Sequence, residues 1–139
     1  MSETDDCIFC QIIEGEIPST KLIETGEVLS FLDISPVNPG HALVVPKRHA
    51  ENLLELRQKE LHAAIFTVQR VARGAVRATD AEGFNVLQNN GKVAGQEVDH
   101  VHFHVIPRFE GDGFDLGWRH GSYEEGEMQE LQEKMKQHF

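Results

Sequence analysis

Three histidines at alternate positions are the residues whose types and spacing predict chemistry most clearly. They lie in the run His100-Val101-His102-Phe103-His104. Strand side chains alternate between faces, so a strand here would turn the imidazoles one way and the apolar residues the other. A neutral imidazole can act as nucleophile or base while its neighbours orient it or protonate a leaving group. We therefore predict a reactive site centred on His102, with a surface metal site and a chance cluster as the alternatives.

A glycine-bearing loop precedes this row of histidines. Gly91, Gly95 and Gln96 place flexible backbone there, and Asn89 lies just before the loop. Backbone N–H groups in such a loop can hold an anion such as phosphate. Glycine loops between strands are common, so this interpretation depends on the neighbouring histidines.

Hydrophobic periodicity and turn residues predict the elements that position these side chains. Apolar residues at three- and four-residue steps indicate a long amphipathic helix. The predicted elements are strands at Leu22–Thr25, Val28–Asp33, His41–Pro46, Gly83–Asn89 and Asp99–Pro107, a helical turn at Cys7–Ile13, a short helix or turn at Asn52–Leu56, and helices at Lys59–Thr79 and Glu124–His138. We predict an α+β fold: a five-stranded antiparallel sheet with one long helix packed on it and a C-terminal helix.

Composition limits the classes of protein to which the chain can belong. Its 139 residues, 40% of them hydrophobic, are enough for one domain with a real core. We expect a single domain over residues 1–139, with a flexible tail at 1–6 and a C-terminal extension at 111–139. The net charge of −10 argues against binding a nucleic-acid backbone. No apolar run is long enough to cross a membrane, and the acidic N-terminus does not resemble a signal peptide, so we expect a cytoplasmic location.

The run from Gly95 to Arg108 resembles the signature of the histidine triad (HIT) family, in which three histidines alternate with apolar residues. Upstream segments resemble the same family. They are Ile8-Phe9 with Ile12-Ile13, Gly15-Glu16-Ile17-Pro18, Phe31 to Pro36, Pro39-Gly40-His41 and Val45 to His49. The resemblance covers about residues 7 to 119, and it implies a HIT-like fold.

The resemblance also implies a reaction and a role for each site residue. Family members bind nucleotides and transfer or hydrolyse nucleoside monophosphates through a nucleotidyl-histidine intermediate. The nucleophile would be His102, with His104 at the phosphate or leaving group and His41 buried beside them. Asp33 would accept the ribose hydroxyls. The phosphate would meet Asn89, Gly95, Gln96 and Glu97, and the base would be enclosed by Ile8, Phe9, Ile12, Phe31, Ile34 and Leu43, for which plain core packing is the alternative.

The implied substrates are purine nucleotides with a leaving group on the α-phosphate: phosphoramidates, adenylylated compounds or dinucleoside polyphosphates. Family members are typically homodimers, with the long helix and a strand at the interface. One departure concerns Glu97, because the phosphoramidate-hydrolysing branch usually has a serine there. The alternative function is therefore a nucleotide-binding, zinc-stabilised scaffold with weak catalysis.

The two cysteines, Cys7 and Cys10, have the C-x-x-C spacing of half a tetrahedral zinc site. Zinc-bearing members of the family complete such a site with a histidine after the middle strand and the first triad histidine. Here these positions are His49 and His100. We expect structural Zn²⁺ on these four residues. The alternatives are free buried thiols or a redox pair, and no thioredoxin-like βαβ pattern supports the latter.

Overall fold

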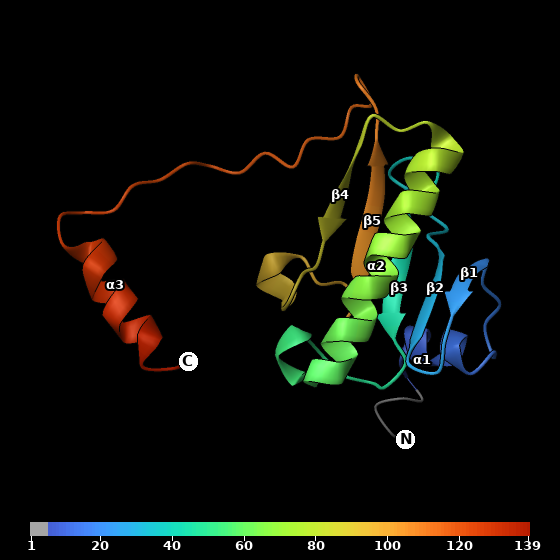
Figure 1. The fold of residues 1–139 in the computed structure, drawn as a ribbon, viewed down its shortest axis with the longest axis horizontal. Helices are drawn as coiled ribbons and strands as arrows, with labels where there is room; N and C mark the ends of the chain where they lie inside the picture. Colours follow the sequence, from blue (N-terminus) through green and yellow to red (C-terminus); the bar gives the residue numbers. More distant parts are fainter. Residues whose placement is uncertain (1–5) are drawn as a thin grey trace.

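A five-stranded sheet forms the centre of the computed structural model, which describes residues 6–139 (Figure 1). The strand order is β1-β2-β3-β5-β4, and every neighbouring pair is antiparallel. The elements are α1 (Ile8–Ile13), β1 (Lys21–Glu24), β2 (Val28–Leu32), β3 (Ala42–Pro46), the 3₁₀ turn η1 (Leu53–Glu55), α2 (Gln58–Thr79), β4 (Gly83–Leu87), η2 (Lys92–Ala94), β5 (Phe103–Arg108) and α3 (Glu127–Lys136). The predicted α+β architecture is confirmed. The predicted tail lies outside the described residues except for Asp6.

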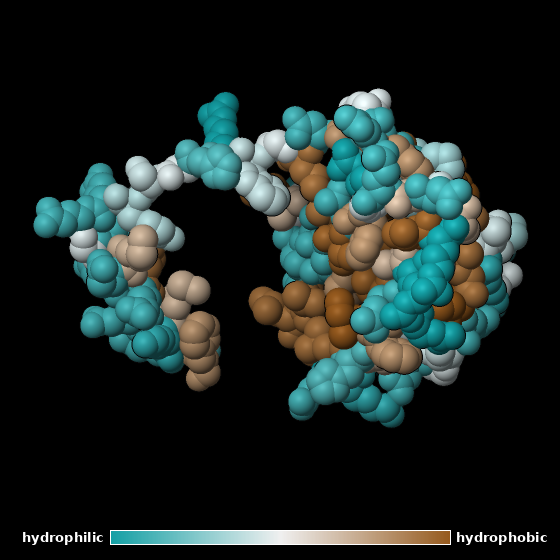
Figure 2. Space-filling view, turned by 45° about the horizontal axis from the view of Figure 1, so that its top comes forward, coloured by the Kyte–Doolittle hydropathy of each residue, from teal (hydrophilic) through white to brown (hydrophobic). Residues whose placement is uncertain are grey.

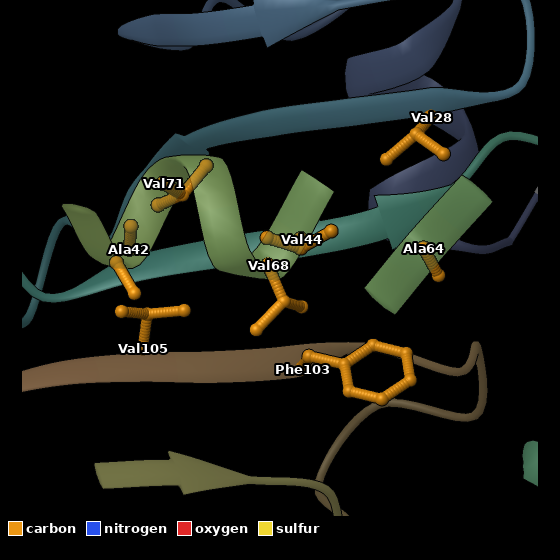
Figure 3. Close-up of a cluster of buried hydrophobic side chains, with 9 residues drawn as sticks. Val28, Ala42, Val44, Ala64, Val68, Val71, Phe103 and Val105 are labelled. Atoms are coloured by element: carbon orange, nitrogen blue, oxygen red, sulfur yellow. The ribbon is translucent and has the colours of Figure 1, made fainter. Parts of the chain in front are cut away.

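The long helix α2 covers one face of the sheet (Figure 1). Its inward side chains include Ala64, Val68 and Val71, and they meet strand residues such as Val44 and Val105 in one buried cluster (Figure 3). Fully burying a valine side chain stabilises the fold by roughly 1.5–3 kcal/mol. Alternation along β2 and β3 explains why this face is apolar.

The opposite face of the sheet is covered by the N-terminal segment. Leu29 and Leu43 point to this side, where Phe9 and Ile12 of α1 pack on them. Phe9 contacts Phe31 edge to face, with ring centroids 6.0 Å apart. Both faces of the sheet are therefore buried, one under α2 and the other under α1. The site residues lie on the α1 side.

The histidine row is not wholly in a strand, and this corrects the predicted bounds of β5. Ladder pairing begins at Phe103, so His100 and His102 precede the strand. The cause is a long-range contact, because the Val101 N–H donates to the Ala50 carbonyl at 2.8 Å instead of joining a neighbouring strand. The alternation nevertheless continues: Val101 packs with Ala50 and Leu56, away from the imidazoles.

Gly40 fixes the turn that leads into β3. Residues with a side chain rarely adopt its backbone φ of +92°, and an added Cβ would lie 3.0 Å from Thr79 Cγ2 and 3.1 Å from Pro107 Cγ. Only glycine fits this close approach without strain. The turn places His41 at the start of β3, next to β5.

The C-terminal extension departs from the body of the fold. After Phe114 the chain has no regular structure until α3, which stands apart from the sheet at the end of an extended segment (Figure 1). The segment is largely hydrophilic, whereas the body exposes hydrophobic side chains among hydrophilic ones (Figure 2). In the described part of the chain, no helix has both the length and the apolar character needed to cross a membrane.

Candidate active site and metal centre

Two histidines, one directly before β3 and one in β5, meet beside a cavity. Leu43 of β3 pairs with His104 of β5, and His41 lies two residues before Leu43. His41 Nε2 is therefore only 3.0 Å from His104 Nδ1. The Val37 N–H donates to His41 Nδ1 at 3.0 Å, so in the neutral tautomer Nε2 carries the proton and donates it to His104 Nδ1. Because His104 Nδ1 accepts this bond, the single proton of the neutral His104 ring is on Nε2. His104 Nε2–H can therefore donate a hydrogen bond to a ligand.

A different backbone contact sets the tautomer of His102. Its Nδ1 lies 2.8 Å from the His100 carbonyl oxygen, and a carbonyl can only accept, so Nδ1 carries the proton. Nε2 of His102 is then unprotonated and has a free lone pair. The ring is 6% exposed and packs on the edge of Phe9 at 4.9 Å between centroids. This is the arrangement that a nucleophilic imidazole requires.

Burial keeps these imidazoles neutral. It lowers the pKa of His104 to about 4, helped by the proximity of His102 and His41. Burial also lowers the pKa of His102, although the His100 carbonyl, Asp33 and Glu97 act against this. The pKa of His41 is lowered by burial and partly restored by Asp33. Neutral histidines keep their lone pairs at neutral pH.

The histidines line a cavity of about 500 Å³. Of the predicted nucleotide-site residues, thirteen line it: Ile8, Phe9, Ile12, Phe31, Asp33, Ile34, His41, Leu43, Asn89, Gly95, Glu97, His102 and His104. One end of the wall is apolar, which suits a planar base, and His102, His104 and Asn89 supply polar groups. The sequence thus predicted the composition of one concave site, which is where ligands bind preferentially.

Gln96 is the exception among the predicted phosphate contacts. It is buried and does not line the cavity. Its side-chain oxygen accepts from the Gly91 N–H at 2.7 Å, and its side-chain nitrogen donates to the Glu51 and Val98 carbonyls. Gln96 therefore braces the loop, while Gly95 and Glu97 on either side of it line the cavity.

Gly95 brings that loop against Asn89. With φ at +95°, its missing Cβ would lie 3.3 Å from Asn89 Nδ2. The Asn89 amide donates to the Gly95 carbonyl at 3.5 Å, a long bond that a bound anion can replace. The amide is thus held near the histidines with donor capacity left over.

Phe114 is a wall residue that sequence reasoning missed. It comes from the stretch predicted to be irregular, and Arg108 holds it in place. The Arg108 guanidinium lies 4.8 Å from the Phe114 ring centroid and donates to the Phe114 carbonyl. Arg108 also forms a two-pronged ion pair with Asp112, at 2.7 and 3.0 Å, and holds the pKa of that carboxyl well below its usual range. No local pattern in the sequence signals this contact.

The four predicted metal ligands meet at one point. Nδ1 of His100 lies 3.4 Å from Cys7 Sγ, 3.5 Å from Cys10 Sγ and 3.2 Å from His49 Nδ1. Tetrahedral zinc with bonds of about 2.0–2.3 Å separates its ligands by roughly 3.3–3.8 Å. The donor set and spacing of these residues therefore fit Zn²⁺.

The tautomer of His100 also suits a metal ligand. Its Nε2 donates to the Pro46 carbonyl at 2.7 Å, which leaves the Nδ1 lone pair aimed at the cysteines. Burial raises the pKa of Cys10 to about 12 when no cation is present, with a further rise from the hydrogen bond that the Cys10 thiol donates to Cys7. Both cysteines are buried and free of disulfides. A bound divalent cation would remove this penalty by stabilising the thiolates.

Asp33, His41 and His104 also lie close together, but their hydrogen bonds disfavour a second metal site. His41 Nδ1 already accepts the Val37 N–H. If Nε2 also gave a lone pair to a metal, the ring would have to lose its last proton. The cluster is therefore better described as a chain of hydrogen bonds that fixes which nitrogen of each histidine carries the proton.

Comparison with known proteins agrees with this geometry. The HIT domain family matches residues 14–111. The chain belongs to the HIT family. An adenosine 5'-monophosphoramidase of Candida albicans is 42% identical over 142 residues, covering 99% of this chain and 93% of that protein. An adenylylsulfatase of Arabidopsis thaliana is 43% identical over 108 residues, covering 78% of this chain and 55% of that protein.

Solved HIT structures share the architecture. A HIT family protein from Bacillus subtilis superposes with a TM-score of 0.91 at 41% identity, covering 96% of this chain and 97% of that one. A Zn-bound histidine triad family protein from Mycobacterium smegmatis gives a TM-score of 0.75 at 35% identity, covering 96% of each chain. The zinc-bound relative and the Cys7, Cys10, His49, His100 cluster together suggest a zinc site.

Proposed function

We propose that this HIT protein is a nucleotide hydrolase that cleaves nucleoside 5'-phosphate derivatives at the α-phosphorus. The observation that carries this proposal is the bond from His102 Nδ1 to the His100 carbonyl, which leaves Nε2 as a free nucleophile. The relatives named as a monophosphoramidase and an adenylylsulfatase support a hydrolase. The candidate substrates are phosphoramidates, other adenylylated compounds and dinucleoside polyphosphates.

The reaction has two displacement steps. The His102 Nε2 lone pair attacks phosphorus, and the bond from phosphorus to the leaving group breaks. The departing nitrogen takes one proton from solvent and leaves as a neutral amine, while His104 Nε2–H donates a hydrogen bond to the departing group. Water then attacks the nucleotidyl-histidine, the phosphorus–nitrogen bond to His102 breaks, and one proton from water returns to solvent. The products are a nucleoside monophosphate and the amine, with both histidines restored.

The remaining lining residues position the nucleotide. Ile8, Phe9 and Leu43 offer an apolar slot for the base, and Asp33 offers carboxylate oxygens to the ribose hydroxyls. Asn89 can donate to a non-bridging phosphate oxygen. Holding the phosphate next to a prepared nucleophile replaces a collision in solution with an intramolecular step, which lowers the barrier substantially.

We propose that the metal centre is structural. Zinc on Cys7, Cys10, His49 and His100 would tie the start of α1 to the segment that carries His102. This matters for catalysis because the carbonyl that orients His102 belongs to His100 itself. Zinc thus supports the nucleophile through a neighbouring residue and takes no part in bond breaking.

We also propose that the protein is a homodimer. Ile65 and Val76 of α2 and Phe84 and Val86 of β4 line a shallow apolar groove of about 440 Å³ on the outer surface. Exposed apolar surface shared by a helix and an edge strand is typical of an interface. Sedimentation equilibrium should give twice the chain mass, and a monomer at micromolar concentration would contradict the proposal.

The test of the proposed function is turnover of adenosine 5'-phosphoramidate, adenylyl sulfate and diadenosine tetraphosphate by the wild type and by His102→Ala. We expect the wild type to release AMP from at least one of them. The variant should lose at least a thousandfold in kcat/KM, since no other group supplies the nucleophile. Equal turnover by both proteins would overturn the nucleophile assignment, and nucleotide binding without turnover by the wild type would favour a scaffold.

A further inference from the structure

The charges that line the candidate nucleotide cavity are unusual for a site that holds phosphate. Its charged side chains are two carboxylates, Asp33 and Glu97. Within residues 6–139, no lysine or arginine lines this cavity. Sites that bind several phosphates normally supply such cations. A single α-phosphate can be held by neutral donors, whereas a chain of phosphates would meet two negative charges.

The two carboxylates differ in how they are held. Asp33 accepts the Ser35 N–H at 2.8 Å, and its other oxygen lies 3.6 Å from His41 Nε2. Glu97 is exposed and makes no hydrogen bond or ion pair with any residue from 6 to 139. Among residues 6–139, therefore, no partner neutralises its charge.

The backbone of Glu97 is nevertheless fixed. Its neighbour Gln96 is 4% exposed and anchors the loop through the Gly91 N–H and the Glu51 and Val98 carbonyls. Glu97 and His102 line the same cavity, and the charge of Glu97 raises the pKa of His102 against the effect of burial. A fixed backbone, with no described partner for the side chain, keeps one negative charge at the cavity that contains His102.

We propose that Glu97 is a specificity-determining residue that selects substrates whose leaving group carries a positive charge. The proposal rests on the proposed function, and it names the substrate class as nucleoside phosphoramidates of diamines and similar ammonium-bearing amines. Anionic leaving groups, including further phosphates, are disfavoured by the same charge. Two unit charges about 6 Å apart in a half-solvated cleft change an equilibrium by roughly tenfold.

The test compares three adenosine 5'-phosphoramidates that share the same phosphorus–nitrogen bond. Their amines are a diamine with a free ammonium, a neutral alkylamine of equal length and an amino acid with a free carboxylate. Relative to the neutral substrate, we expect wild-type kcat/KM at low salt to be roughly tenfold higher for the ammonium substrate and roughly tenfold lower for the carboxylate substrate, a ratio of roughly a hundredfold between the two charged substrates. Added salt should narrow this ratio, because exposed charges are screened.

Two isosteric variants isolate the side chain. Glu97→Gln should bring the ratio close to one while the neutral substrate is still hydrolysed. Glu97 also lines a second cavity, which it shares with Cys7, His49 and Asp99. Asp99→Asn is the matched control, because Asp99 lines this second cavity but not the nucleotide cavity. It should keep the wild-type ratio.

The outcomes separate this inference from the proposed function. An unchanged ratio in Glu97→Gln, or a wild-type ratio near one, would overturn the role of Glu97 and leave the hydrolase intact. Failure of the wild type to hydrolyse any of the three compounds would overturn the substrate class named here, and the proposed function would fall with it only if adenylyl sulfate and diadenosine tetraphosphate were not hydrolysed either.

Discussion

His41 Nε2 lies 3.0 Å from His104 Nδ1, and the Val37 N–H donates to Nδ1 on the other side of the His41 ring. This chain of two hydrogen bonds fixes which nitrogen of His104 carries a proton. His41 is therefore a positioning residue, since it acts on the reaction through His104. Burial lowers the pKa of His41 itself, so His41 stays neutral and continues to donate to His104 Nδ1.

His41→Ala should lower kcat by roughly ten- to a hundredfold, part of the 10²–10³ that a positioned hydrogen-bond donor contributes. KM should change less, because the base and ribose contacts remain. Steady-state kinetics would check this split, with circular dichroism as the folding control. A variant with unchanged kcat would show that His104 needs no orienting partner.

The pH profile should show an acid limb well below the ordinary histidine range. The pKa of His104 is lowered to about 4, so its ring gains a second proton only as pH falls toward that value. The pKa of His102 is also lowered, and protonation there would remove the nucleophile. We expect kcat/KM to be flat from about pH 8 down to the ordinary histidine pKa of about 6.5, and its acid limb to lie below that value. A limb centred near 6.5 would indicate solvated histidines.

Zinc removal should destabilise the fold. Protein purified without chelator should contain about one zinc per chain by atomic emission, and Cys10→Ser should contain much less. Losing a cation present at about 100 times its Kd removes about 2.7 kcal/mol, which lowers Tm by roughly 10 °C. Restoring zinc to chelated wild type should recover Tm. Full stability in the metal-free wild type would contradict the structural role.

Breaking the contact that holds Phe114 should weaken nucleotide binding. Arg108→Lys keeps the positive charge but loses the planar guanidinium group, which donates two hydrogen bonds to the Asp112 carboxylate. We expect Kd for AMP to rise roughly three- to tenfold as Phe114 leaves the wall. Phe114→Ala should give a similar rise, and calorimetric titration measures both. If Arg108→Lys bound AMP normally while Phe114→Ala did not, the ring would be held by something else.

Spacing in the sequence was sufficient to find the histidine row and the cysteine pair, whereas the resemblance to zinc-bearing HIT proteins added His49 and His100 to the proposed metal site. Alternation by two and the C-x-x-C pair are local patterns, and their functional meaning survives small errors in strand bounds. The long helix was found because Leu61, Ile65 and Val68 repeat with helical periodicity. These features are properties of neighbouring residues.

The features that were missed depend on distant contacts. β5 begins at Phe103 because Val101 bonds to Ala50, far away in the chain. The Gln96 side chain is buried and hydrogen-bonds within the protein to stabilise its loop. A glutamine next to a glycine in the sequence does not predict this orientation. Phe114 is held at the cavity by Arg108 and Asp112, which contact its ring, its carbonyl and its N–H. Pairings of this kind arise from tertiary packing, and no periodicity records them.

The central claim is that His102 Nε2 becomes covalently bound to the nucleotide. The direct measurement is mass spectrometry of enzyme quenched in acid-free denaturant within milliseconds of mixing with adenosine 5'-phosphoramidate. We predict a transient mass increase of one adenylyl group, localised by peptide fragmentation to His102 and absent in His102→Ala. Rapid AMP release with no adduct on His102 at any time point, or an adduct on another residue, would contradict the account.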